Sequence, residues 1–429
     1  MTHKKLLTHF TYCAAVAAPL VFSTISQAQS NPTPTVSITN ADDKSTPVQN
    51  NSEKKAEAVK TAIIDEKVFK RPIVEGKVSL SLFSEDTFQG RGANNPVNNY
   101  SRAAVSANIY ATENLYLSGN FRVNSPSTKT TGEYFFDDAA LMIAELAIRY
   151  DAKDYSLVAG HTNVNYSLAR RYASGLWGTS MARSEYGVDN MLVLGGQYKI
   201  NAGEFGNHAI SLNTFMVDNS FLSDAVGGSR NPTPLSIGGS GNTGKFNNFA
   251  IALDGLKIKA IPKFRYQLAA VQMATENLYN PYTKTALNTN YTADEQRYLA
   301  AAMLDKLDVY NGIKLTPLLE YNKTQNSLGI AGFNKQYVTG SLLFTYKQWN
   351  LGLSGSVWDA NWSKITTASG LLPKDPTLND TNHQAQIALG YVFQNGIKAN
   401  IGYRKENKFN NVTAQSVALN LSYDLPFAF

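Results

Sequence analysis

The feature that most constrains the fold is an alternation of apolar and polar side chains with a period of two residues, which begins near Val74 and recurs to the end of the chain. Successive side chains of a β-strand point to opposite faces, so each such segment predicts a strand with one apolar face. The last segment shows the pattern without a break. Its apolar positions are Val417, Leu419, Leu421, Tyr423, Leu425, Phe427 and Phe429.

Sixteen segments of this kind can be counted, and the connections between them alternate in length. The predicted strands are 76–88, 102–111, 115–124, 140–150, 155–164, 189–200, 208–218, 246–256, 264–274, 295–307, 313–323, 335–347, 349–359, 383–393, 397–407 and 415–429. Tight connections such as 111–114, 151–154, 347–349 and 394–396 alternate with long ones at 89–101, 125–139, 165–188, 219–245, 275–294, 324–334 and 360–382. Outer-membrane barrels combine an even strand number with short turns at one rim and long loops at the other. The sequence therefore predicts an all-β fold, a closed antiparallel transmembrane barrel of about 16 strands over 71–429.

The composition agrees with a surface that faces lipid. Only 17% of the residues are charged, whereas soluble domains average about 25%. Tyrosines are abundant, at 23, and many fall beside predicted turns, where aromatic rings sit at the boundary of water and lipid. A sheet can span lipid only when it closes, because every backbone group must be paired. No stretch after the N-terminal segment has the roughly 20 apolar residues of a membrane-spanning helix.

The N-terminal segment reads as an export signal. Lys4 and Lys5 precede an apolar run, and Ser26-Gln27-Ala28 has the form of a cleavage site, so we predict a signal peptide over 1–28. Its removal takes away the one cysteine and lowers the formal net charge from +6 to +4, because two lysines and no acidic residue are lost. Such a mild excess does not indicate a nucleic-acid partner.

Residues 29–70 differ in composition from the predicted barrel. Residues 29–51 are rich in Pro, Thr, Ser and Asn and contain no aromatic residue, so they cannot bury enough surface to fold alone. A short amphipathic helix is predicted over 53–67, with a frayed linker as the alternative. We therefore expect 29–70 to form a periplasmic extension ahead of the barrel.

The end of the chain carries a recognisable pattern. Tyr423, Phe427 and the terminal Phe429 resemble the signal by which outer-membrane barrels are handed to the barrel assembly machinery. Together with the export signal and the strand pattern, 71–429 resembles the Gram-negative outer-membrane porins. The resemblance implies a water-filled channel for passive diffusion of small hydrophilic solutes and ions, placed among outer-membrane lipid and lipopolysaccharide and assembled as a homotrimer. The extension at 29–70 departs from the simplest porins.

Strand parity predicts which charges face the lumen. If apolar side chains face outward, eight cations and three anions occupy the alternate positions. They are Arg102, Arg122, Arg149, Arg265, Lys314, Lys347, Lys398 and Arg404, with Glu145, Glu320 and Asp424. Fixed charges select permeants by sign, so we expect a mild anion preference. The alternative is that several of these groups lie near the rims, where salt screens them over about 8–10 Å.

The third long connection, 165–188, is more aromatic and basic than the others. In porins, the external loop at this ordinal position folds into the barrel and narrows it. The resemblance implies that Arg170, Arg171 and Arg183 face the permeant, while Tyr172 and Trp177 pack on the wall or stack on solute. An external loop packed on its neighbours is the alternative.

Enzymatic chemistry finds little support. None of the three histidines after the signal peptide has the HExxH spacing of a metalloprotease. His161 and His383 are followed two residues later by Asn163 and Ala385, not by the serine that an outer-membrane phospholipase needs. We therefore expect no catalytic residue, no metal and no cofactor.

Two other barrel functions remain open from the sequence. A receptor for active uptake would need a globular plug of more than 100 residues, but only about 40 separate the signal peptide from the barrel. An adhesin-type barrel would use its long Asn-rich loops and conduct no ions. Liposome swelling separates both from a passive pore.

Overall fold

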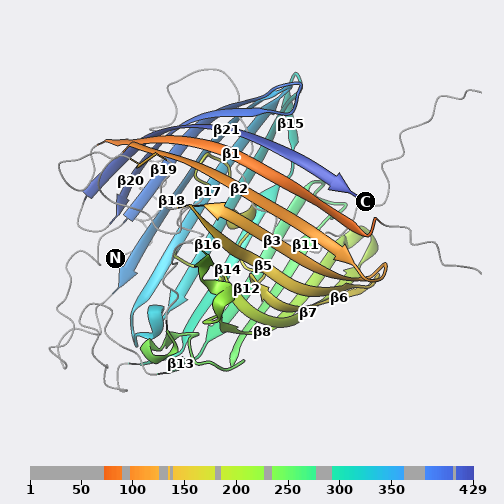
Figure 1. Cartoon of the computed structure of the whole chain (residues 1–429), viewed down its shortest axis with the longest axis vertical. Coiled ribbons are helices and arrows are strands. Elements are labelled where there is room, and N and C mark those ends of the chain that lie inside the picture. The colour runs from red at the N-terminus through yellow and green to blue at the C-terminus, as the bar shows by residue number, and fades with distance from the viewer. Residues whose placement is uncertain are drawn as a thin grey trace, which may run out of the picture.

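The alternating segments form sixteen long antiparallel strands that close into a barrel in the computed structural model of the chain (Figure 1). The structure describes residues 72–88, 97–124, 134–135, 139–178, 185–226, 234–276, 292–361, 382–408 and 412–429. The barrel strands are β1 (Val74–Phe88), β2 (Val97–Tyr110), β3 (Leu115–Asn124), β5 (Ala140–Asp151), β6 (Tyr155–Thr162), β7 (Met191–Asn201), β8 (Asn207–Val217), β11 (Asn248–Leu256), β12 (Phe264–Met273), β14 (Glu295–Leu304), β16 (Ile313–Gln325), β17 (Asn334–Tyr346), β18 (Trp349–Asn361), β19 (Asn382–Val392), β20 (Lys398–Lys408) and β21 (Val412–Ala428). The predicted strand number and fold class are confirmed. The signal peptide and the extension lie outside the described residues.

Closure joins the first strand to the last. β1 pairs with β2 on one side and with β21 on the other, in a register that runs from Glu75 opposite Ala428 to Phe88 opposite Gln415. Val74 and Phe429 also exchange two backbone hydrogen bonds of 2.9 Å. The ring of long strands therefore has no free edge, as a sheet in lipid requires.

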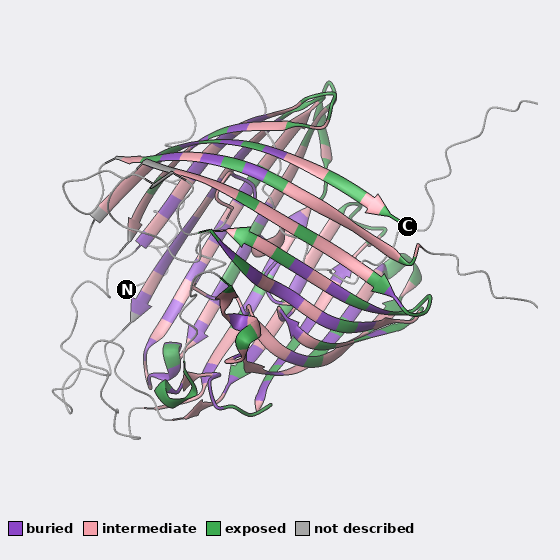
Figure 2. Ribbon diagram, in the orientation of Figure 1, coloured by how far each residue is buried: buried purple, intermediate pink, exposed green. Residues whose placement is uncertain are grey.

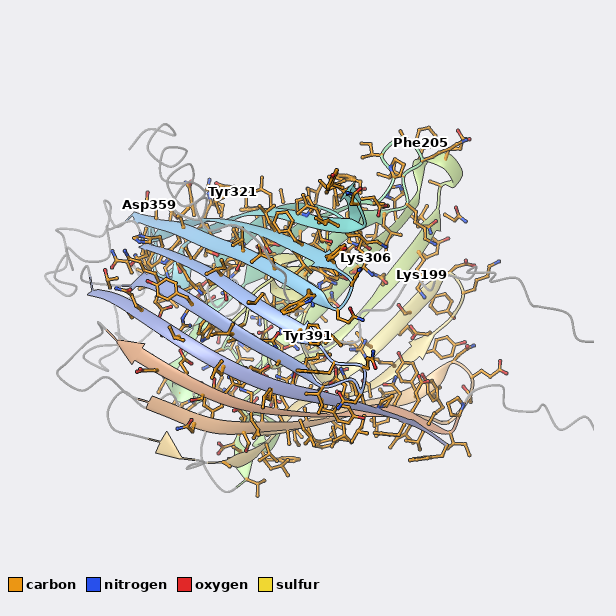
Figure 3. All side chains as sticks on the ribbon, turned by 90° about the horizontal axis from the view of Figure 1, so that it is seen from above. Lys199, Phe205, Lys306, Tyr321, Asp359 and Tyr391 are labelled. Carbon is orange, nitrogen blue, oxygen red and sulfur yellow. The ribbon has the colours of Figure 1, made fainter. Side chains whose placement is uncertain are left out.

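The two rims differ as the sequence predicts. Connections at one rim are tight, at 111–114, 152–154, 202–206, 257–263, 347–348 and 393–397. The other rim carries long connections, among them 163–190, 218–247 and 274–294. Lys199, Phe205 and Lys306 lie toward the rim of short turns and Asp359 toward the opposite end (Figure 3).

Short elements complete the sheet at its rims. β4 (Tyr134–Phe135) pairs with β2, and β15 (Leu307–Tyr310) extends the hairpin that begins β16. β10 (Gly239–Ser240) and β13 (Thr275–Glu276) pair with each other in a separate two-stranded sheet. Within the described residues, the 3-10 turns are η1 (Gly203–Phe205), η2 (Phe221–Ser223), η3 (Leu235–Ile237) and η5 (Ser327–Gly329).

The short strand β9 takes the place of β6 beside β5 where β6 ends before its neighbour does. β6 ends at Thr162, and β9 (Ala225–Val226) pairs with β5 at Leu141 and Met142, beyond the point where β6 has left the sheet. A hydrogen bond of 2.6 Å between His161 Nδ1 and Asp218 Oδ2, both fully buried, ties the segment before β9 to the end of β6.

The outer face is apolar and exposed. Large apolar side chains on alternate strand positions keep about half of their surface accessible, for example Leu82 at 52%, Leu194 at 55% and Leu419 at 54%. Bands of exposed and buried residues consequently alternate along the strands (Figure 2). Such a continuous apolar exterior on a closed sheet is the surface that lipid covers, so the chain is an outer-membrane barrel. Among the described residues, no helix is long and apolar enough to cross a membrane.

Aromatic rings gather on this exterior near the rim of short turns. Trp349 contacts Tyr391 edge to face with ring centroids 4.6 Å apart, and Tyr391 contacts Phe393 at 4.9 Å. At the end of the chain, Phe427 and Phe429 stack with ring centroids 5.6 Å apart. A girdle of this kind is typical of the membrane interface.

Candidate functional site

The connection between β6 and β7 runs from 163 to 190, and its described residues, 163–178 and 185–190, lie in the interior of the barrel. It carries the one-turn helix α2 (Ala169–Tyr172). Beyond this helix, Ser174 donates its backbone N–H to Ser341 Oγ on β17 (2.8 Å) and its hydroxyl contacts the Leu353 carbonyl on β18 (3.2 Å). Counted along the ring, β18 lies halfway round the barrel from β6. The loop therefore reaches the opposite wall.

The loop tip continues past β18 to two further strands. Trp177 donates its backbone N–H to Gln386 Oε1 on β19 (3.2 Å). Its ring lies against Gly402 on β20, where an added Cβ would meet the ring at 3.0 Å. Because these contacts fall inside the strands and not at their ends, the tip lies within the lumen.

Glu320 on β16 anchors the loop. This carboxylate is 1% exposed and accepts three hydrogen bonds from the loop. The donors are the Ser167 hydroxyl at 2.6 Å, the Ala169 backbone N–H at 2.9 Å and the Tyr186 hydroxyl at 2.8 Å. A buried carboxylate is tolerated when such donors surround it, so the three bonds hold both arms of the loop against β16.

Burial also controls the donor state of Tyr186 in the loop. Burial raises the pKa of this hydroxyl well above its ordinary value, and the nearby Glu320 carboxylate acts in the same direction. Tyr186 therefore keeps its proton and remains a donor to Glu320.

An apolar cluster packs the loop against one half of the inner wall. The loop side chains Tyr166, Leu168 and Tyr186 are each at most 2% exposed. They pack on Phe333, in the connection before β17, and on inward-facing wall residues, which include Phe215, Val271, Leu299, Leu318 and Trp358. The main apolar core consequently lies inside the barrel, between the loop and strands β7 to β18.

The other half of the wall, from β20 through β21 and β1 to β5, is charged. Arg404 forms an ion pair with Glu85 (3.0 Å) and lies over the Trp177 ring (4.9 Å to its centroid). Arg102 lies over the rings of Phe83 and Tyr100, at 4.7 and 4.9 Å from their centroids. These residues border the space between the loop tip and the wall.

The other predicted lumen charges differ from one another in their partners and exposure. Arg149 and Glu145 form a buried ion pair (2.8 Å), Arg122 bonds Asn120 (2.7 Å), and Lys398 pairs with Asp424 (2.8 Å). Arg265 donates to the Tyr172 hydroxyl of the loop (2.6 Å), and Lys314 is exposed near the rim of short turns.

Two expectations about these charges need correction. Lys347 does not occupy a lumen-facing strand position, because it lies in the two-residue turn between β17 and β18 with a positive φ of 51°. Glu320 does point inward, but the loop covers it completely, so its charge does not face open solvent. The alternation along a strand predicts which face of the sheet a side chain lies on, but it does not predict whether another segment of the chain buries that side chain.

The predicted loop residues are brought together by α2. Arg170 forms an ion pair with Asp189 (2.8 Å). The Arg171 side chain donates from Nε to the Ser167 carbonyl (3.2 Å) and lies 3.8 Å from Asp254. Arg183 lies outside the described residues. Asp189 and Asp254, the acids that face these two arginines, and Glu85, the partner of Arg404, are absent from the expected set. Parity on β1 and β11 nevertheless places Glu85 and Asp254 on the inner face.

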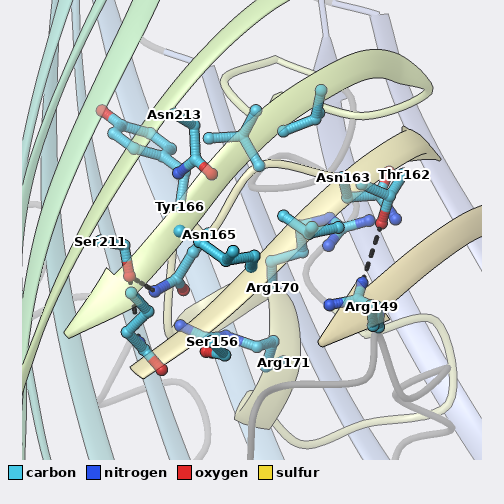
Figure 4. Close-up of a pocket in the computed structure, with 16 residues that line it drawn as sticks. Arg149, Ser156, Thr162, Asn163, Asn165, Tyr166, Arg170, Arg171, Ser211 and Asn213 are labelled. Atoms are coloured by element: carbon cyan, nitrogen blue, oxygen red, sulfur yellow. Dashed lines mark hydrogen bonds between the residues drawn. The ribbon is translucent and has the colours of Figure 1, made fainter. Parts of the chain in front are cut away.

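A pocket opens between the loop and the wall formed by β5 to β8 (Figure 4). Three arginines contribute to it, Arg149 from the wall and Arg170 and Arg171 from α2. Most of the other polar lining is amide or hydroxyl, from Ser156, Thr162, Asn163, Asn165, Gln197, Ser211 and Asn213. Among the described residues, no group of three or more metal-ligating side chains is found.

Comparison with known proteins identifies the fold. The outer membrane channel DcaP of Acinetobacter baumannii is similar over 82% of this chain and 96% of its own, with 12% identity and a TM-score of 0.51. OprB of Pseudomonas putida is similar over 82% and 94%, with 10% identity and a TM-score of 0.56. No protein-family model and no curated protein matches the chain. The chain thus has the closed barrel fold of the Gram-negative outer-membrane porins.

Proposed function

We propose that this chain is a passive outer-membrane channel, without enzymatic activity, for small hydrophilic solutes and ions. The observation that carries the proposal is the path of the loop at 163–190, whose Ser174 contacts the wall opposite its origin at 2.8 Å. A loop held there leaves the passage of the barrel between Trp177 and the part of the charged half that runs from β21 through β1 to β5, because the Trp177 ring already lies against Gly402 on β20. The loop is the constriction, and Trp177, Tyr172, Arg170 and Arg171 belong to it.

A mild anion preference follows from the charges on that half of the wall. Most of its cations have an acidic partner, since Arg404 pairs with Glu85 and Lys398 with Asp424. Arg102 is exposed and forms no ion pair with a described carboxylate. The aromatic rings beneath it hold the guanidinium toward the lumen, where an uncompensated positive charge favours anions.

Planar-bilayer recording with purified protein tests this proposal. We expect stepwise conductance in KCl, and in a KCl gradient a reversal potential of the sign that chloride preference gives. A cation-favouring reversal potential would remove the anion preference but leave the channel. Absence of any conductance from folded protein would favour the receptor or adhesin-type barrel instead.

We also propose that the barrel assembles as a homotrimer in the outer membrane. The exposed apolar exterior supports association within lipid, since packed side chains replace lipid contacts there. Native mass spectrometry of protein in mild detergent should give three times the mass of the chain without its signal peptide, and a monomer mass alone would contradict the trimer.

A further inference from the structure

The pocket between the loop and strands β5 to β8 has polar atoms that the protein itself leaves without partners. Ser156 Oγ, Gln197 Oε1 and Arg171 Nη2 are all buried and make no hydrogen bond with the described residues. All three residues line this one pocket. Buried polar groups in folded proteins are almost always paired, so their convergence on one cavity points to a solute that completes them.

The hydrogen bonds around these atoms determine which of them are donors and which are acceptors toward a ligand. Ser211 Oγ accepts hydrogen bonds from Gln197 Nε2 (3.0 Å) and from Asn165 Nδ2 (3.3 Å), so the hydroxyl proton of Ser211 is available to a ligand. The amide group of Gln197 is thereby oriented with its oxygen unpaired. The pocket thus presents hydroxyl donors beside one fixed amide acceptor.

Charge in the pocket is positive on the side of the loop. Arg171 anchors its Nε to the Ser167 carbonyl (3.2 Å), and its Nη2 is 3.8 Å from Asp254, beyond hydrogen-bond distance. Arg170 and Arg149 are held by their own ion pairs with Asp189 and Glu145. Arg171 is therefore the guanidinium with capacity left for an anion.

From these atoms we propose that the pocket is a solute-binding subsite for small hydroxycarboxylates, such as sugar acids. The carboxylate accepts from Arg171, because a guanidinium and a carboxylate form strong charge-assisted hydrogen bonds. The hydroxyl groups of the solute donate to Gln197 Oε1 and accept from Ser156 and Ser211. A neutral sugar lacks the charge, and a simple carboxylate lacks the hydroxyl groups. This inference rests on the proposed channel, since solute reaches the pocket through the lumen.

Isothermal titration of purified, folded barrel with gluconate tests the subsite, with glucose and acetate as the comparison solutes. We expect gluconate to bind at least about tenfold more tightly than either, because glucose lacks the carboxylate that accepts from Arg171 and acetate lacks the hydroxyl groups that pair with Gln197, Ser156 and Ser211. Arg171→Gln should weaken gluconate binding about tenfold or more, and Ser156→Ala should weaken it by a smaller factor. The matched control is Lys259→Gln, which removes an exposed cation at the rim of short turns and should leave the affinity unchanged.

The outcomes separate this inference from the proposed function. Equal affinity for gluconate, glucose and acetate, or wild-type gluconate affinity in folded Arg171→Gln protein, would overturn the subsite even if the barrel conducts. Selective gluconate binding by protein that conducts no ions would support the subsite and overturn the channel. Ser156→Ala keeps the test informative if Arg171→Gln does not fold.

Discussion

Replacing Glu320 by alanine should release the loop from the wall and widen the lumen. The substitution removes the acceptor of three hydrogen bonds, from Ser167, Ala169 and Tyr186. A buried donor left unsatisfied costs about 1–3 kcal/mol, so holding the loop in place would cost about 3–9 kcal/mol. Burial of one apolar loop side chain contributes only about 1.5–3 kcal/mol. The lost anchor is therefore comparable to the packing of several side chains, and we expect the loop to leave its position.

Single-channel conductance measures this release. Glu320→Ala should raise the single-channel conductance and the noise of the current. Glu320→Gln keeps one acceptor oxygen, so its conductance should lie between those of Glu320→Ala and the wild type. Thr316→Ala is the matched control, since Thr316 lies on the same face of β16 and its hydroxyl accepts from the Lys306 backbone N–H near the rim of short turns (3.1 Å), away from the loop. It should conduct as the wild type does.

A disulfide reports the position of the loop independently. The hydroxyl oxygens of Ser174 and Ser341 are 2.8 Å apart, so Ser174→Cys with Ser341→Cys should cross-link under oxidation and fix the loop tip on β17. Wild-type conductance in folded Glu320→Ala protein, together with failure of this cross-link, would refute the reasoning.

Three further predictions concern other parts of the barrel. Arg102→Gln should move the reversal potential in a KCl gradient toward that of a non-selective pore, and an unchanged potential would exclude Arg102 from selectivity. Burial raises the pKa of Asp218, but hydrogen bonds from His161 and Ser220 outweigh it and hold the pKa below its usual value. The stabilisation is therefore present above about pH 4 and lost as the pH falls through the folded-state pKa, so Asp218→Asn should lower the thermal unfolding midpoint at pH 7 and by progressively less as the pH falls below about 4. Gly76→Leu should impair barrel assembly, measured by heat-dependent migration in gels, because even a Cβ at Gly76 would lie 2.6 Å from the Phe427 ring.

The strands could be predicted from the sequence because lipid and lumen impose opposite requirements on alternate side chains. Leu419 and Leu421 need an apolar surrounding, and Asn420 between them needs water or hydrogen bonds. That local rule gives the strand number, the alternating lengths of the connections give the two unequal rims, and the need to pair every backbone group in lipid gives closure.

The contacts of the loop could not be predicted, because they depend on residues far apart in the sequence. Nothing near Ser174 indicates Ser341 as its partner, and nothing near Glu320 indicates that Ser167 and Tyr186 cover it. Lys347 was wrongly predicted to occupy a lumen-facing strand position, and the reason is different. At the end of an alternating segment, the pattern does not show whether the last residue belongs to the strand or to the turn that follows. The positive φ of Lys347 results from the two-residue turn between β17 and β18.

Liposome swelling with neutral sugars of graded size tests the central claim most directly, since it measures passage through the lumen and not charge movement. Proteoliposomes with wild-type barrel should swell rapidly in small sugars, more slowly as the sugar grows, and not at all in large oligosaccharides. Glu320→Ala should shift that limit to larger sugars. No swelling in any sugar, from protein that has folded into the bilayer, would contradict a water-filled channel.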